Sequence, residues 1–155
     1  MQRGFTLMEV IIYIALLGTL LSGSITTALA LADGAERNAH RIARRGEAAF
    51  IEDKIRWSLV NARDILIAAD GAVLIVQKRA GQTFDTADNP IRIYEEDSAL
   101  MIKRGSKTAL PLNSERFPVR EFRVNVESNA LGTAVFVEFQ IEEDLFHVSF
   151  TIDTD

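Results

Sequence analysis

The stretch "RGFTLMEVIIYIALLGTLL", from Arg3 to Leu21, places one glutamate, Glu9, inside an otherwise apolar segment near the start of the chain. From Phe5 to Ala32, Glu9 is the only side chain that is charged at neutral pH. As a helix this segment is roughly 42 Å long, because each residue adds about 1.5 Å. That length exceeds the roughly 30 Å of hydrocarbon in a bilayer, so the segment predicts a single membrane-spanning helix.

Two other interpretations of the apolar segment are weaker. A secretory signal peptide has an apolar region of only about 7 to 15 residues, although Ala28, Ala30 and Ala32 imitate its cleavage site. A buried core helix needs a comparably apolar partner, and the rest of the chain offers none. Glu9 therefore needs an explanation, because a charge in a membrane helix is costly and usually functional, even though a glutamate near the end can reach the interface.

Composition limits the classes of protein to consider. The 155 residues are 48% hydrophobic and 25% charged, which is enough for one domain with a core and an appendage. The net charge of -5 gives no reason to expect nucleic acid as a general partner, because phosphate binding needs clustered Lys and Arg. The absence of cysteine excludes disulfides and thiolate metal sites.

The motif Gly4-Phe5-Thr6-Leu7-Met8-Glu9, after Arg3 and before the apolar helix, resembles the N-terminal signature of type IV prepilins and of type II secretion pseudopilins. The resemblance implies that a membrane peptidase cuts between Gly4 and Phe5 and N-methylates Phe5. It also implies that Glu9, the fifth residue of the processed chain, neutralises the terminal amine of a neighbouring subunit. A buried charge is tolerated only when it is paired, so Glu9 is expected to act in assembly and not in catalysis.

Departures from the family pattern favour a minor subunit. Many major pilins have a helix-kinking proline at the place of Thr26, but the first proline here is Pro90. The two cysteines that bracket the C-terminal region of many major pilins are absent as well. Arginines just after the span would, by charge alone, place that side in the cytoplasm; the processing motif requires the opposite orientation and takes precedence. These arginines are Arg37, Arg41, Arg44 and Arg45.

Residues 33–62 predict an amphipathic continuation of the helix, with Gly34 as a weak point. A mostly apolar stripe recurs every three or four residues and is expected to pack against a sheet. The stripe consists of Ile42, Gly46, Ala49, Phe50, Asp53, Trp57 and Val60, and is widened by Ile51, Ile55, Leu59 and Ala62. The arginine cluster, with His40, is interpreted as a solvated helix face or a contact with another subunit. The alternative is that this cluster contacts DNA or anionic lipid.

Residues 63–155 predict short antiparallel strands. Alternation is clearest where Val135, Val137, Phe139 and Ile141 share one face, which indicates a half-buried sheet. A long helix on such a sheet is an α+β, pilin-like fold. The order of helix, meander and final strand group resembles the J-type minor pseudopilins.

A catalytic interpretation has little support. His40 and His147 are the only histidines, and no metal-binding spacing accompanies them. The acidic runs 95–97 and 142–144 lie at expected turns, where solvation is the simpler role. The chain is therefore expected not to be an enzyme and to need no cofactor or metal, with calcium at an acidic turn left open.

The resulting hypothesis is a minor structural subunit that initiates or caps a type II secretion pseudopilus or a type IV pilus. Its expected parts are a leader (1–4), a transmembrane and filament-core helix (5–32), an amphipathic continuation (33–62) and a β domain (63–155). Expected partners are prepilin peptidase, other subunits, an inner-membrane assembly platform and lipid before assembly. Its expected location is the bacterial inner membrane, with the N-terminus in the cytoplasm, and then the filament. The alternatives are a membrane-anchored extracytoplasmic binding module and a DNA-uptake minor pilin.

Overall fold

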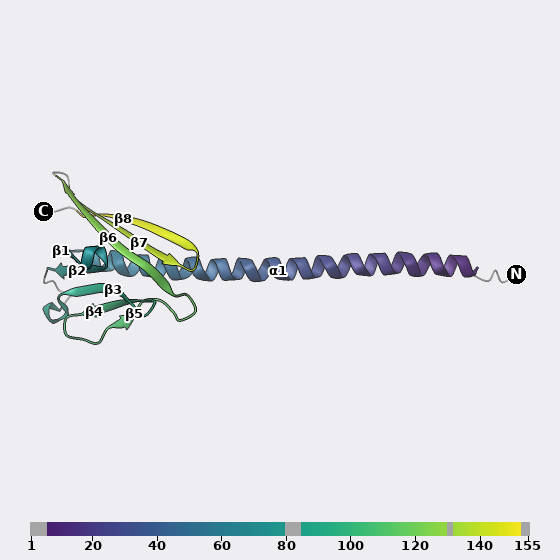
Figure 1. Cartoon of the computed structure of the whole chain (residues 1–155), viewed down its shortest axis with the longest axis horizontal. Coiled ribbons are helices and arrows are strands. Elements are labelled where there is room, and N and C mark those ends of the chain that lie inside the picture. The colour runs from purple at the N-terminus through teal and green to yellow at the C-terminus, as the bar shows by residue number, and fades with distance from the viewer. Residues whose placement is uncertain (1–5, 80–84, 130–131, 153–155) are drawn as a thin grey trace. The chain divides into compact units, whose positions relative to one another are not determined.

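The computed structural model describes residues 6–79, 85–129 and 132–152. Within these residues one long helix, α1 (Leu7–Leu59), precedes eight strands. Figure 1 labels the helix and the strands in chain order. The C-terminal part of α1 packs with antiparallel sheets, which confirms the predicted α+β, pilin-like fold. The chain forms two compact units, Met1–Ala43 and Arg44–Asp155, so α1 contributes to both.

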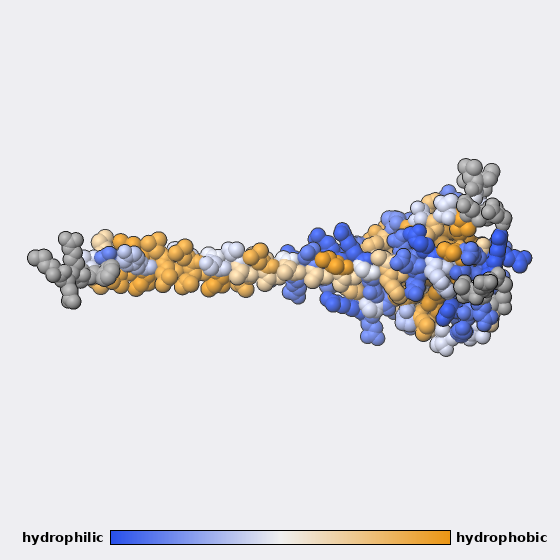
Figure 2. Space-filling model, turned by 180° about the vertical axis from the view of Figure 1, so that it is seen from behind, coloured by the Kyte–Doolittle hydropathy of each residue, from blue (hydrophilic) through white to orange (hydrophobic). Residues whose placement is uncertain are grey.

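The first unit is an isolated helix whose apolar side chains are exposed. Leu7, Leu16 and Leu29 are each more than half exposed, and the apolar surface of this part of the helix is visible in Figure 2. By length and composition, α1 is the one described helix that is able to cross a membrane. Exposed apolar surface of this extent requires lipid or other helices around it.

Hydroxyl side chains in the middle of this helix bond to its own backbone. Each hydroxyl donates a hydrogen bond to a carbonyl oxygen three or four residues earlier. The hydroxyls in this set therefore keep a hydrogen-bond partner even when apolar groups surround the helix. The donor–acceptor pairs, at 2.8–2.9 Å, are Thr19–Leu16, Ser22–Gly18, Ser24–Leu20, Thr26–Ser22 and Thr27–Gly23. The helix stays continuous through this region and through Gly34.

The strands of the second unit form two antiparallel sheets instead of one. The first sheet is a meander that runs in chain order, and the second is a three-stranded meander. The first contains β1 (Ala62–Ala68), β2 (Val73–Lys78), β3 (Ile91–Glu96), β4 (Ala99–Arg104) and β5 (Leu110–Pro111). The second contains β6 (Val119–Asn129), β7 (Gly132–Ile141) and β8 (Asp144–Ile152), and the short helices η1 (Ala69–Gly71) and η2 (Thr86–Asp88) lie in the connections of the first.

Residues with left-handed backbone angles fix the turns. Asp97 (φ 51°) and Ser98 (φ 63°) form the two-residue turn between β3 and β4, where positive φ at both central positions matches the strand twist. Gly105, at φ +54°, follows β4 where an added Cβ would lie 2.1 Å from the carbonyl oxygen of Ala87. This position therefore requires glycine both for its backbone angle and for the close approach.

The core of the second unit confirms the strand pattern and corrects the predicted packing face of α1. Val135, Val137, Phe139 and Ile141 are all fully buried, as their alternation predicted. The predicted principal stripe of α1 is wrong, because several of its members are exposed. Those exposed residues are Ile42 (63%), Phe50 (47%), Trp57 (40%) and Val60 (53%). The face against the sheets consists of Ala48, Ile51, Ile55, Ser58 and Leu59, of which Ile51, Ile55 and Leu59 were predicted to widen the stripe.

Candidate functional site

Glu9 lies in the first turn of α1, where local hydrogen bonds define the start of the helix. The Glu9 amide donates to the carbonyl oxygen of Thr6 at 3.0 Å and lies 3.3 Å from its Oγ1. Thr6 thus occupies the N-cap position and Glu9 the third helical position, which is the spacing of a capping box. Gly4 and Phe5, the predicted processing residues, lie outside the described residues.

The Glu9 carboxylate has a partner one helical turn away. The Tyr13 hydroxyl donates to Glu9 Oε1 at 3.5 Å, and Glu9 is half-buried beside it. A carboxylate accepts several hydrogen bonds, so this contact leaves capacity for a cation. The positive end of the helix dipole also favours an anion at this turn.

Sequence reasoning identified Glu9 but missed the contributions of Thr6 and Tyr13. Both left a signal in the sequence. Thr6 and Glu9 have the T-x-x-E spacing of a capping box, and Tyr13 follows Glu9 by four residues, the spacing of neighbours on one helix face.

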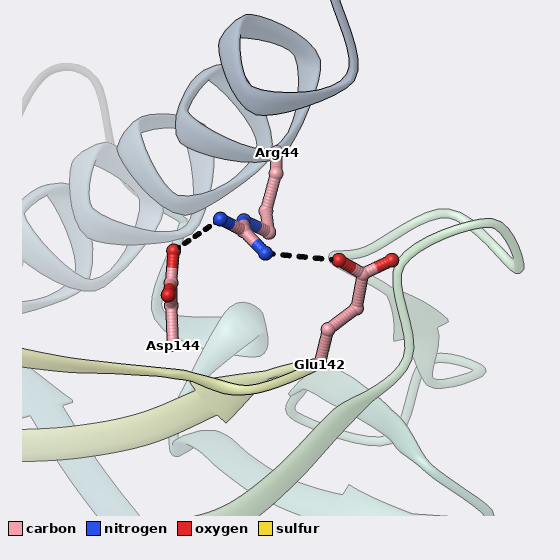
Figure 3. Close-up of polar contacts among 3 residues, drawn as sticks. All are labelled: Arg44, Glu142 and Asp144. Atoms are coloured by element: carbon pink, nitrogen blue, oxygen red, sulfur yellow. Dashed lines mark hydrogen bonds and ion pairs between the residues drawn. The ribbon is translucent and has the colours of Figure 1, made fainter. Parts of the chain in front are cut away.

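In the second unit, Arg44 connects α1 to the turn between β7 and β8 (Figure 3). Its Nη1 lies 3.0 Å from Glu142 Oε2, and its Nη2 lies 2.5 Å from Asp144 Oδ2. The Arg44 side chain is only 16% exposed. Arg44 therefore contacts the interior of the second unit and does not belong to the predicted solvated arginine cluster. Arg41 and Arg45, in the same cluster, are exposed.

Lys78 stabilises the C-terminal end of α1 from the neighbouring strand β2. Its ammonium donates to the backbone carbonyl oxygen of Trp57 at 2.6 Å and lies 4.2 Å from the centre of the Trp57 ring. A cation at a helix C-terminus is favourable because carbonyl groups accumulate there. Burial lowers the pKa of the Lys78 ammonium.

The surface of the second unit has shallow grooves. One of about 350 Å³ lies over β6 and β7 beside Arg123 and Phe136, and one of about 500 Å³ lies beside Glu96 and Met101. His147 is exposed, and its Nδ1 lies 3.0 Å from Glu138 Oε1.

The acidic turn at 142–144 forms ion pairs within the same chain. Glu142 and Asp144 both pair with Arg44. In the part of the chain that the structure describes, no group of three or more His, Asp and Glu side chains is arranged to hold a metal ion. The prediction that no metal is needed stays a prediction.

Comparison with known proteins identifies the N-terminal segment. Residues 1–25 match the family model described as the prokaryotic N-terminal methylation motif. No curated protein and no solved structure matches the chain. The matched region contains Thr6, Glu9 and Tyr13, together with much of the exposed apolar part of α1.

Proposed function

We propose that this chain, a type IV pilin or pseudopilin by its N-terminal methylation motif, is a minor structural subunit that initiates or caps a filament. The filament is a type II secretion pseudopilus or a type IV pilus. The observation that carries the proposal is the motif at residues 1–25 directly ahead of a long helix with exposed apolar side chains. The motif favours a structural subunit over an enzyme. It also implies two general classes of partner, which are other pilin subunits and prepilin peptidase.

Processing is proposed to create the group that Glu9 binds. Cleavage between Gly4 and Phe5, with N-methylation of Phe5, leaves a cationic amine at the new start of the chain. The segment 5–32 then anchors the subunit in the inner membrane, with the N-terminus in the cytoplasm and the β domain outside. The apolar helix and the motif fit a single-pass protein anchored in the inner membrane.

The proposed partner of the amine is the Glu9 carboxylate of a neighbouring subunit. An unpaired charge in an apolar filament core costs several kcal/mol, whereas a paired charge is tolerable, so the pair selects one axial register between subunits. The geometry of Glu9 supports this role, because the carboxylate lies in the first turn of α1, where the helix dipole attracts an anion, and its contact with the Tyr13 hydroxyl leaves acceptor capacity for a cation.

A second feature of α1 supports assembly through helix packing. Ala49, Phe50 and Trp57 form an exposed seam on α1, which Val60 extends just after the helix ends, whereas the sheets cover the face around Ile51 and Ile55. These seam residues recur at intervals that suit a helix neighbour. The exposed seam gives the second unit an apolar surface for helices of other subunits.

The test replaces Glu9 by leucine in the full chain, produced together with its own peptidase and assembly system. Glu9→Leu is expected to insert into the membrane but to enter filaments at a small fraction of the wild-type level, because the neighbouring amine loses its counter-charge. Glu36→Leu is the matched control, since Glu36 is exposed on the same helix. The readout is the ratio of the chain in sheared filaments to that in membranes, and normal incorporation of Glu9→Leu would refute the pairing role.

Intact mass spectrometry tests the processing step independently. The wild-type chain is expected to begin at methylated Phe5, and Gly4→Ala is expected to be cleaved slowly because the added methyl group crowds the cut. A chain that retains Met1 to Arg3 in the presence of active peptidase would instead support the alternative, a membrane-anchored extracytoplasmic binding module.

A further inference from the structure

Two cations lie directly opposite each other in the first sheet. Arg92 on β3 pairs with Lys103 on β4, so the two side chains share one face of the sheet. Arg92 is exposed and Lys103 is half-buried, whereas Ile91 and Ile93 are fully buried on the opposite face. Like charges in a directly opposed cross-strand pair destabilise a sheet. The pair therefore needs an explanation other than the stability of the fold.

The second sheet shows how this chain arranges charges across strands elsewhere. There Arg123 lies opposite Glu138, and Glu138 lies opposite His147 in the next strand. The Nδ1 atom of His147 is 3.0 Å from Oε1 of Glu138. A carboxylate thus lies between two basic side chains in the second sheet, whereas Arg92 and Lys103 face each other without one.

Asp88 precedes β3, and its carboxylate is occupied by other cations. Lys107 contacts Asp88 Oδ1, and Arg104 pairs with Asp88 Oδ2. Within the described residues, neither Arg92 nor Lys103 forms an ion pair. An anion from outside the chain would relieve the repulsion between these two cations, and it would accept charge-assisted hydrogen bonds from both.

Apolar side chains border the cation pair on the same face. Ile75 on β2 lies opposite Arg92, and the next pair along β3 and β4 is Tyr94 with Met101. Ile75, Tyr94 and Met101 are all half-buried, so each keeps some exposed apolar surface. A free phosphate or sulfate ion has no apolar part to place against this surface. A carboxylate in a protein segment, with apolar residues beside it, uses both the cations and their border.

The opposite end of the same strands limits the length of the anion. Strand β3 ends at Glu95 and Glu96, and Asp97 follows in the turn. Glu96 is four residues from Arg92, which is about 13 Å along a strand. DNA carries a charge about every 1.7 Å, so a duplex that runs along these strands brings phosphates against the carboxylates. The site therefore suits one carboxylate and not a polyanion.

We propose that Arg92 and Lys103 form a binding site for an acidic segment of another protein, with one aspartate or glutamate between two large apolar residues. The planar guanidinium of Arg92 suits a carboxylate, and the Lys103 ammonium shares the same anion. The apolar neighbours of the carboxylate contact Ile75 on one side and the pair of Tyr94 and Met101 on the other. This inference goes beyond the proposed function and does not depend on it.

A second copy of this chain does not supply such a segment. Among its 22 acidic residues, only Glu9 and Glu138 have Val, Ile, Leu, Met, Phe, Tyr or Trp on both sides. Glu9 belongs to the apolar part of helix α1. Glu138 contacts His147 and lies between Val137 and Phe139, which are fully buried in the core. The partner is therefore a different protein.

Carbodiimide coupling identifies the bound carboxylate. The reagent joins an amine to a carboxylate that touches it, so Lys103 reports its own partner when the full chain is treated in intact membranes and filaments. Lys107, which contacts Asp88, is the internal control, because their coupling shows that the reaction has worked. Mass spectrometry is expected to find Lys103 joined to an aspartate or glutamate of another protein, between two large apolar residues.

Arg92→Glu separates binding from folding. A carboxylate opposite Lys103 replaces repulsion by attraction, so the denaturation midpoint of the full chain in detergent is expected to rise. Recovery of the protein identified by coupling is expected to fall by at least about tenfold, because Lys103 is then paired within the chain. Arg123→Glu makes the same change of charge opposite Glu138, and is expected to lower the midpoint but to leave recovery unchanged.

Four results would overturn the proposal. The first is that Lys103 is joined to no other protein although Lys107 is joined to Asp88. The second is that Lys103 is joined to a second copy of this chain, which would assign a contact between copies. The third is equal recovery of the partner with Arg92→Glu and Arg123→Glu. The fourth is a labelled DNA duplex that binds the wild-type chain but not Arg92→Glu, which would make the ligand a nucleic acid.

Discussion

At the scale of single residues, Glu9 combines a local role with a proposed intermolecular one. Its backbone amide is capped by Thr6, and its carboxylate accepts from Tyr13. Sequence alone singled out Glu9 because a carboxylate is costly in lipid, but the neighbours that hold it follow from helix geometry. The structure thus places Glu9 in a group with Thr6 and Tyr13 on the first turns of α1.

Replacing Tyr13 by phenylalanine tests whether the hydroxyl positions the carboxylate. Tyr13→Phe is expected to leave cleavage after Gly4 unchanged and to lower incorporation into filaments by about twofold to tenfold, the range for one lost hydrogen bond. The measurement is the filament-to-membrane ratio of the chain, compared with that of Glu9→Leu. A loss as large as that of Glu9→Leu would show that the hydroxyl does more than position Glu9.

Asp88 is predicted to make the β domain sensitive to acid. Its side chain is 10% exposed; Lys107 Nζ contacts Oδ1, and Arg104 Nη1 lies 3.7 Å from Oδ2. The hydrogen bond from Lys107 lowers the pKa of Asp88; burial opposes the shift, and the charges of Lys107 and Arg104 reinforce it. A lowered pKa in the folded state means that the carboxylate adds stability above its unfolded pKa of about 3.9, and that this stability is lost as the pH falls through the folded value.

Asp88→Asn is therefore expected to lower stability at neutral pH and to flatten its decline on acidification. Denaturation of the full chain in detergent, followed by the fluorescence of its single tryptophan, Trp57, gives this comparison. Asp85→Asn, at an exposed neighbouring position, is the control. An unchanged acid dependence in Asp88→Asn would contradict the assigned role.

At the scale of elements, strand alternation was predictable and the packing face of α1 was predictable only in part, because Ile51, Ile55 and Leu59 were placed beside the principal stripe instead of at its centre. From Val135 to Ile141 in β7 the buried residues alternate with less buried ones, because one face of the sheet meets the core and the other is turned toward solvent. Between Ile42 and Leu59, however, α1 has apolar residues on two faces, and periodicity alone does not say which face a sheet covers. The structure assigns the sheets to the face of Ile51 and Ile55.

Matched isoleucine substitutions distinguish the two faces of α1. Ile51→Ala removes a side chain that is fully buried and is expected to destabilise the β domain by about 2–5 kcal/mol. Ile42→Ala removes one that is 63% exposed and is expected to change stability by less than about 0.5 kcal/mol. Chemical denaturation of the full chain in detergent measures both, and similar effects for the two variants would contradict this assignment.

At the scale of the whole molecule, the chain divides its apolar residues between two uses. In the described part of the first unit, residues 6–43, the large apolar side chains face outward. In the second unit, Arg44–Asp155, apolar side chains form a core between the C-terminal part of α1 and two sheets. The first use was predictable from Glu9 and the uninterrupted run after it. The division into two sheets and the inward role of Arg44 were not predictable, because each depends on which segments meet across long sequence separations.

Arg44 is predicted to hold the second sheet against the helix. Arg44→Gln keeps much of the stem but removes the charge that pairs with Glu142 and Asp144, and is expected to cost about 1.5–3 kcal/mol. Hydrogen exchange of the full chain is expected to show the greatest loss of protection at the β7–β8 turn. Arg45→Gln, at an exposed neighbouring position, is the control, and equal exchange in the two variants would contradict the role of Arg44.

The cap at Thr6 has a consequence for the order of events in the life of the subunit. The proposed cut falls before Phe5, so the hydrogen bonds from the Glu9 amide to Thr6 lie wholly on the retained side. Proteolysis then changes the charge at the start of the chain without unravelling the first turn. The new amine then lies one residue before Thr6, the residue that caps the helix, so the first turn of α1 does not have to form anew when a neighbouring subunit binds.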